Sequence, residues 1–237
     1  MGLKNASLSI LKVTVAGLGL LLSHVAVAGC VQDPPNSWVC VGDDSTGLAT
    51  GNTPDIVEVV SGAIVNGNIT TDGGDDVVTN HGTVTGYIRL GAGADSLQNF
   101  GEVGVEIRGG PDDDEIVNGG IAPFIRGRAG DDVITLITGA KSTVINGGVG
   151  IDTLVFKFAW LSPLDFQAIE AAVASNLAAG SVSVAGQTYT WSNMEQLTNN
   201  STLRAAQVPT LSDLALILLG LTLAMFAYFR HPSRMSV

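Results

Sequence analysis

TDGGDDVV (71–78) is followed at regular intervals by LGAGADSL (90–97), GGPDDDEI (109–116), GRAGDDVI (127–134) and GGVGIDTL (147–154). Each segment has an aspartate two residues before its last residue, and these aspartates recur at steps of 19, 19, 18 and 20 residues. They are Asp76, Asp95, Asp114, Asp132 and Asp152, with a weaker copy of the segment around Asp55. A fixed period of this length indicates a solenoid, in which each repeat covers the apolar face of the next.

The second half of each repeat predicts the shape of one coil. A short β-type run follows each aspartate, and a turn of the Asn-x-Gly type separates it from a second run. The turn residues form two columns: Asn80, Asn99 and Asn118, and Gly82, Gly101 and Gly120. Two strands and two turns in about 19 residues predict an all-β, right-handed parallel β-solenoid of five to six coils over residues 55–156. Stacked coils place each column in a ladder with a spacing of about 4.8 Å.

Composition limits the class of function. The chain has 237 residues, a net charge of −11, 30 glycines and only 5% aromatic residues, which suits a thin solenoid core. Its acidity argues against nucleic acid as a partner, because few cations are present to neutralise phosphates. We expect no enzyme, since the part between the two ends has a single histidine, His81, and its acids follow the repeat. A polysaccharide-active enzyme is the least favoured alternative.

The N-terminal residues predict export. Residues 1–28 have two lysines, an apolar run and small residues before Gly29, as in a secretory signal peptide. We expect residues 29–54 to cap the solenoid, with a disulfide between Cys30 and Cys40, because an oxidising compartment favours pairing of two cysteines. A second interpretation stays open, since Val27-Ala28-Gly29-Cys30 resembles a bacterial lipoprotein box, which implies a lipid on Cys30.

Residues after the repeats predict a second cap and a membrane anchor. Helical spacing over 163–178, with Ser162 as N-cap, and a hairpin over 181–191 define a cap at 157–197. Residues 198–207 are then a polar linker. Residues 211–229 are almost all apolar, and at 1.5 Å per residue they are just long enough to cross a bilayer.

The C-terminal segment 208–237 resembles a bacterial sorting tail. A short motif, a predicted membrane helix and a basic end resemble IPTL-CTERM tails, which are similar in layout to PEP-CTERM signals. The motif residues are Val208, Pro209, Thr210, Leu211 and Ser212; Val208 departs from the usual isoleucine. The resemblance implies a Gram-negative source, delivery to the cell envelope, surface or beyond, and an exosortase-like sorting enzyme as a partner.

The acidic turns resemble a second family. GGVGIDTLV and GRAGDDVIT resemble the glycine-rich nonapeptides of RTX, or haemolysin-type, proteins, which implies Ca²⁺ as a cofactor at stacked turns. Glycines let backbone carbonyls converge, and Ca²⁺ takes six to eight oxygen ligands. The implied ligands are Asp76, Asp95, Asp114, Asp131, Asp132 and Asp152, with Asp75, Asp112 and Asp113 as secondary candidates. The alternating Asn-x-Gly turns are more similar to bacterial surface and autotransporter-passenger solenoids.

An arginine column offers an alternative to calcium. Arg89, Arg108 and Arg126 each precede an acidic turn, so we consider that they lie over the aspartates and neutralise them without metal. Two functions therefore stay open: a structural or adhesive exported protein that binds Ca²⁺, and a metal-free surface adhesin or glycan-binding module. The second implies extracellular polysaccharide as a partner. We assign Tyr87, Phe100 and Phe124 to packing or surface positions, because their offsets from the aspartates disagree.

Overall fold

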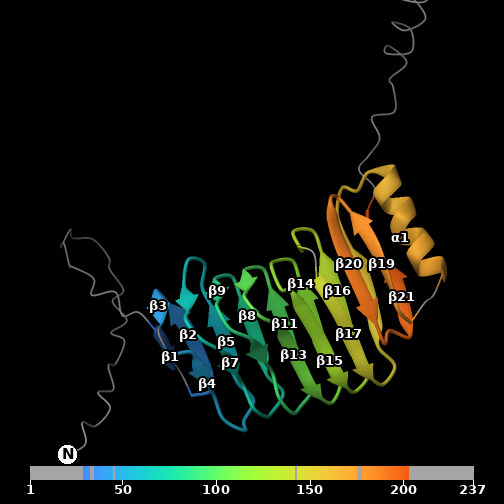
Figure 1. Ribbon diagram of the computed structural model, residues 1–237. Coiled ribbons are helices and arrows are strands. Elements are labelled where there is room, and N and C mark those ends of the chain that lie inside the picture. The colour runs from blue at the N-terminus through green and yellow to red at the C-terminus, as the bar shows by residue number, and fades with distance from the viewer. Residues whose placement is uncertain (1–28, 33–34, 45, 142, 176–177, 203–237) are drawn as a thin grey trace, which may run out of the picture.

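The computed structural model describes residues 29–32, 35–44, 46–141, 143–175 and 178–202. These residues form one stack of coils built from short strands, with a helix at the C-terminal end (Figure 1). All neighbouring strands pair in parallel except those of two hairpins, one at each end. The stack has about six coils, so the predicted parallel β-solenoid is confirmed.

The longest sheet has nine strands and contains the first strand of every coil. In spatial order these are β1 (Gly29–Gln32), β2 (Ser37–Val41), β5 (Ile56–Val59), β8 (Val77–Asn80), β11 (Ser96–Asn99), β14 (Glu115–Asn118), β16 (Val133–Ile137), β18 (Thr153–Lys157) and β21 (Gln196–Asn199). Each acidic turn leads into a strand of this sheet, because each aspartate of the repeat directly precedes one of its strands.

The opposite side of the coils is an eight-stranded sheet. Its order is β19 (Gly180–Val184), β20 (Gln187–Ser192), β17 (Thr143–Val149), β15 (Phe124–Ala129), β13 (Ile107–Pro111), β10 (Ile88–Arg89), β7 (Ile69–Thr70) and β4 (Leu48–Ala49). A third sheet lies between the other two in the early coils only. It consists of β12 (Glu102–Val103), β9 (Thr83–Val84), β6 (Ile64–Val65) and β3 (Asp43–Asp44).

The third sheet differs from the expected two strands per coil, and the glycine column explains it. Gly82, Gly101 and Gly120 make a sharp corner directly after the first strand, and a methyl group on Gly101 would overlap the carbonyl oxygen of Gly82. In the early coils the chain forms one more short strand after this corner, before it reaches the opposite sheet. Past β12 only an isolated bridge between Glu102 and Ile121 continues this third side.

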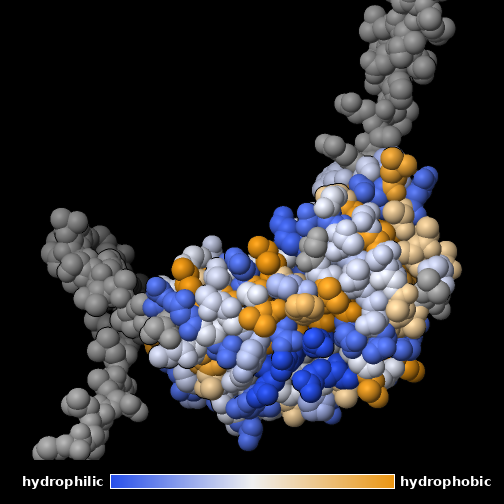
Figure 2. Space-filling model, viewed as in Figure 1, coloured by the Kyte–Doolittle hydropathy of each residue, from blue (hydrophilic) through white to orange (hydrophobic). Residues whose placement is uncertain are grey.

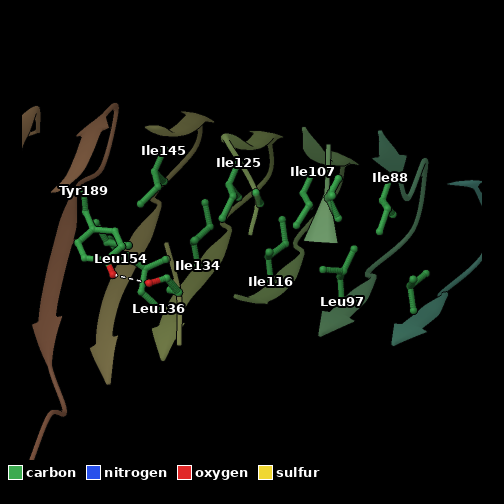
Figure 3. Packing of buried hydrophobic residues seen from close by; sticks show 14 of the residues in the cluster. Ile88, Leu97, Ile107, Ile116, Ile125, Ile134, Leu136, Ile145, Leu154 and Tyr189 are labelled. Carbon is green, nitrogen blue, oxygen red and sulfur yellow. Dashed lines mark hydrogen bonds between the residues drawn. The ribbon is translucent and has the colours of Figure 1, made fainter. Parts of the chain in front are cut away.

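Aliphatic side chains from the two large sheets fill the interior. Figure 3 shows two facing rows, one from the eight-stranded sheet and one from the nine-stranded sheet. The first row is Ile88, Ile107, Ile125 and Ile145, and the second is Leu97, Ile116, Ile134 and Leu154; all eight are 0% exposed. Full burial of such a side chain contributes about 1.5–3 kcal/mol. The rows therefore hold successive coils in register.

The stack extends beyond both ends of the predicted range 55–156. At the start, β2 pairs in parallel with β5, so residues 37–49 form a coil although no period is visible there. At the other end, β20 and β21 continue the two large sheets. Caps that add strands satisfy the edge groups of the last coil, which a separate covering loop would leave unpaired.

The two predicted end structures are otherwise present. The disulfide joins Cys30 to Cys40, which lie opposite each other on β1 and β2. Helix α1 (Pro163–Ser175) begins after Ser162, whose Oγ accepts a hydrogen bond from the backbone N–H of Asp165 at 3.2 Å. Ala185 and Gly186 have positive φ angles and form the tight turn between β19 and β20.

Three predictions lie outside the described residues: the signal peptide at 1–28, the sorting tail at 208–237 and its apolar span at 211–229. In the part of the chain that the structure describes, no helix has the length and apolar character needed to cross a membrane.

Candidate metal centre and surface depressions

Six aspartates form one column inside the stack, and each is at most 3% exposed. This inner aspartate column consists of Asp55, Asp76, Asp95, Asp114, Asp132 and Asp152. From the second member on, Oδ1 accepts a hydrogen bond from the backbone N–H of the aspartate one coil earlier, at 2.7–3.0 Å. The N–H of Asp152 donates to Oε2 of Glu195 at 2.8 Å, so a glutamate ends the column.

The second carboxyl oxygen of each member has no hydrogen-bond partner among the described residues. In the later coils it lies against a glycine: a methyl group on Gly109 would overlap Oδ2 of Asp114, and one on Gly127 would overlap Oδ2 of Asp132. In these coils the glycine at this position is therefore needed to make room for the buried carboxyl. A buried oxygen without a partner is costly when charged, which favours a proton on it.

Burial changes the acidity of this column. Loss of solvent raises the pKa of Asp114 to about 8, that of Asp132 to about 7 and that of Asp95 to about 6. The hydrogen bond from the backbone N–H opposes this effect, and neighbouring carboxylates add to it. Near neutral pH, Asp114 therefore holds a proton most strongly, followed by Asp132.

A second set of carboxylates lies on the solvent side of the same turns. This outer acid row consists of Asp75, Asp112, Asp113 and Asp131, and all four are exposed. Each accepts a hydrogen bond from a backbone N–H of an adjacent coil: Ala94 donates to Asp75 at 3.0 Å, and Ile151 donates to Asp131 at 2.8 Å. One oxygen of each carboxylate is thus fixed by a hydrogen bond, and the side chain remains in contact with water.

These positions bear on the expected calcium ligands. The backbone N–H of Asp132 donates to Oδ1 of Asp152, and the remaining oxygens of Asp114, Asp132 and Asp152 lie against glycines. Within the described ranges, no group of three or more His, Cys, Asp or Glu side chains is placed to hold a metal ion. Among the candidates, the exposed Asp131 and its neighbours in the outer acid row fit a hard cation best, since their carboxylates reach solvent.

The arginines do not neutralise the inner column. Arg108 and Arg126 both pair with Glu106, and Nε of Arg126 lies 2.9 Å from its Oε2. Arg89 lies 3.6 Å from Asp72. Side chains alternate between the two faces of a strand, so the arginines point outward while the aspartates at the turn point inward. The expected arginine–aspartate ladder is therefore wrong for the aspartates of the repeat.

Glu106 is the main residue that sequence reasoning missed. It is 6% exposed and stands between Tyr87 and Phe124 in its column. The two guanidinium groups lower its pKa, with the hydrogen bond from Arg108 as the largest cause. Its column consists of Tyr87, Glu106 and Phe124, so the residue type is not repeated there as it is in the aspartate column. Alignment of the second strands of the repeats shows this exception directly. Glu195 was also missed, because it follows the hairpin and belongs to no repeat.

A surface depression runs along the corner formed by Gly82, Gly101 and Gly120. It has a volume of about 350 Å³, and its lining includes Glu102 and Lys141. The rings of His81 and Phe100 stack along it, with centroids 5.0 Å apart and an angle of 11° between their planes. The Phe100 ring is 42% exposed, which agrees with its assignment as a packing or surface residue.

Comparison of the chain with protein-family models, with curated proteins and with solved structures gave no match.

Proposed function

We propose that this chain is an exported structural and adhesive module of a bacterial cell envelope, without catalytic activity. The single observation that supports the proposal is the continuity of the stack. Hydrogen bonds of the inner aspartate column run from Asp55 to Glu195 and connect each coil from β5 onward to the next. A solenoid held in this way is a rigid carrier that presents its outer faces to a partner.

The ends of the sequence support the setting of this proposal. A signal peptide at 1–28 would export the chain, and the apolar segment at 211–229 would hold it in the inner membrane before an exosortase-like enzyme acts on the tail. The disulfide between Cys30 and Cys40 suits an oxidising compartment.

The test is fractionation of cells that produce the full chain, with both mature termini mapped by mass spectrometry. We expect a chain that begins near Gly29, occurs in the envelope or medium, and is cut by protease added to intact cells. A full-length chain that keeps Met1 and remains in the cytoplasm would contradict the proposal. A diacylglycerol on Cys30 would replace the disulfide by a lipid anchor and keep the envelope location.

Calcium binding is a second candidate function, and the outer acid row is the observation that favours it. Asp113 and Asp131 lie on adjacent coils, because the N–H of Asp131 donates to Oδ1 of Asp113 at 2.7 Å. Like charges this close repel one another, and a divalent cation on the solvent side would relieve the repulsion. Backbone carbonyls and water would complete the ligand set.

A calcium titration followed by thermal melting tests this candidate. We expect the melting temperature to rise from chelator to millimolar Ca²⁺, since a ligand that binds only the folded state stabilises it. The D113N/D131N double variant should lose most of this rise, whereas D114N in the inner aspartate column should keep it. An unchanged melting temperature of the wild-type chain would exclude calcium as a structural ligand.

A further inference from the structure

Four arginines gather on the outer face of the eight-stranded sheet. Arg89, Arg108 and Arg126 occupy equivalent positions on β10, β13 and β15, and Arg128 follows two residues later on the same face. This arginine patch contains four of the six lysines and arginines in the described ranges; Lys141 and Lys157 are the other two. Figure 2 shows a strongly hydrophilic area over β13 and β15, bordered above by an apolar area.

The arginines of the patch outnumber the carboxylates that form ion pairs with them. One carboxylate, Glu106, serves both Arg108 and Arg126. Asp72 serves Arg89 at 3.6 Å, and Arg128 has no ion-pair partner among the described residues. Four guanidinium groups thus have two ion-paired carboxylates among the described residues.

The backbone of Arg128 indicates that this side chain serves a purpose other than stability. Its φ angle is +103°, a conformation that side chains other than glycine rarely adopt. The equivalent positions on the other coils are Asp72, Gly91, Gly110 and Gly148, and of these Asp72, Gly91 and Gly148 also have positive φ angles. An arginine with this φ angle, between Gly110 and Gly148 in its column, costs strain, and such strain is characteristic of functional sites.

Two depressions flank Arg128. One has a volume of about 390 Å³ and is lined by Arg108, Arg126, Arg128, Asn146 and Gly148. The other has a volume of about 310 Å³ and lies toward Arg89 and Asp72. Glycines line the floors of both depressions and keep them flat. The two depressions therefore form a shallow path along the solenoid axis, and arginine side chains recur along it.

Aromatic rings border this path. The guanidinium of Arg108 lies 5.4 Å from the centre of the Tyr87 ring, and that of Arg126 lies 5.9 Å from the centre of the Phe124 ring. Phe124 is 42% exposed, so its ring remains open to a ligand. The rings and Glu106 also hold the guanidinium groups in place, which lowers the entropy lost when they bind.

We propose that the arginine patch binds a linear acidic polysaccharide through the carboxylates of its uronic acid residues. Guanidinium groups bind carboxylates with two parallel hydrogen bonds, and exposed aromatic rings pack against the apolar faces of sugars. The arginines recur once per coil, about 4.8 Å apart, which is close to the advance of one sugar in an extended chain. Four guanidinium groups beside acidic turns suit one carboxylate per sugar better than the dense phosphates of nucleic acid.

The inference rests on the proposed function for its setting, because an exported solenoid meets extracellular polysaccharide. Its test uses purified full chain with chelator present, so the result does not depend on the cellular location or on calcium. Binding of polygalacturonate is measured by calorimetry, with dextran, dextran sulfate and duplex DNA as comparison polymers.

The decisive variant is R128G, which restores the glycine of its column. We expect it to melt at the same or a higher temperature than the wild type and to bind polygalacturonate about tenfold more weakly, the loss typical of one charged hydrogen-bonding group. R126Q should weaken binding to a similar degree. K157Q removes a positive charge from the nine-stranded sheet and should bind like the wild type.

Several results would overturn the proposal. The first is the absence of polygalacturonate binding by the wild-type chain, and the second is an equal effect of R128G and K157Q. Tighter binding of dextran would point to a neutral sugar site. Tighter binding of dextran sulfate would show that the patch prefers sulfates to carboxylates. Tighter binding of DNA would show that its ligand is a nucleic acid and not a polysaccharide.

Discussion

Asp114 lies in the middle of the inner aspartate column and illustrates how one residue type takes two roles. Its Oδ1 accepts the N–H of Asp95 at 3.0 Å, and its other oxygen is buried against glycine. Its sequence neighbour Asp113 belongs to the outer acid row and faces solvent. Adjacent aspartates thus differ in hydration, since only the buried one is removed from water.

We expect the stability of the protein to decrease as pH rises from about 4 to about 8. The pKa of Asp114 rises from 3.8 to about 8 on folding, so the folded state binds more protons than the unfolded state in this window. Each pKa unit that folding adds to a carboxyl is worth about 1.4 kcal/mol, or roughly 3–6 °C in melting temperature. Thermal melting at a series of pH values measures this effect.

The D114N variant should melt with a weaker pH dependence, because an amide resembles the protonated carboxyl at every pH. Asp165 provides the control. Hydrogen bonds from Ala185 and Ser162 lower its pKa, so its contribution is lost only as pH falls below the usual range of an aspartate. D165N should therefore keep the wild-type slope, and a D114N slope equal to it would disprove the buried-proton explanation.

Single glycines also decide whether the coils can stack. A methyl group on Gly110 would overlap the carbonyl oxygen of Gly91, whereas Gly51 has nothing within 4 Å of the same position. We expect G110A to separate two coils and to lower the melting temperature by more than 5 °C, the size expected for a steric change costing about 3 kcal/mol. G51A should melt within 2 °C of the wild type, and equal melting of the two variants would refute the steric explanation.

At the scale of elements, the strands after the acidic turns end in a short asparagine ladder. Nδ2 of Asn80 donates to Oδ1 of Asn99, and Nδ2 of Asn99 donates to Oδ1 of Asn118, both at 2.8 Å. Leu136 takes the next position, so Nδ2 of Asn118 has no acceptor in the described part of the chain. The ladder therefore orders the three-sided early coils and stops where the third sheet ends.

Replacement of the middle asparagine should be more costly than replacement of the last. N99A removes three hydrogen bonds, to Asn80, Asn118 and the carbonyl of Ile121, whereas N118A removes the one from Asn99. At about 1 kcal/mol for each bond, we expect losses near 3 and 1 kcal/mol beyond a similar cavity term. Urea unfolding measures both values, and equal losses would show that the ladder does not act as a unit.

At the scale of the whole molecule, each coil contacts only the coils beside it. The disulfide therefore acts on one end: it joins β1 to β2, and β2 pairs further with β5 alone. The helix and hairpin close the other end through β20 and β21. Stability in such a stack is close to a sum of nearest-neighbour terms, so damage at one end stays local.

Removal of the disulfide should loosen the first coil and leave the middle unchanged. In a C30S/C40S variant we expect faster amide hydrogen exchange in β1 and β2, because disulfides of this kind contribute about 2–4 kcal/mol. Strands β11 and β14 should exchange as in the wild type. Faster exchange in all coils would instead show that the solenoid unfolds as a single cooperative unit.

The sequence by itself determined the period, the parallel stack and the cap helix. These depend on the spacing of residue types along the chain, which stacking converts directly into columns. Only the tertiary structure decided that the repeated aspartates face inward, that Glu106 pairs two arginines, and that residues 37–49 already form a coil. A period shows which residues share a column, whereas the direction of a side chain depends on the corner geometry and on neighbours one coil away.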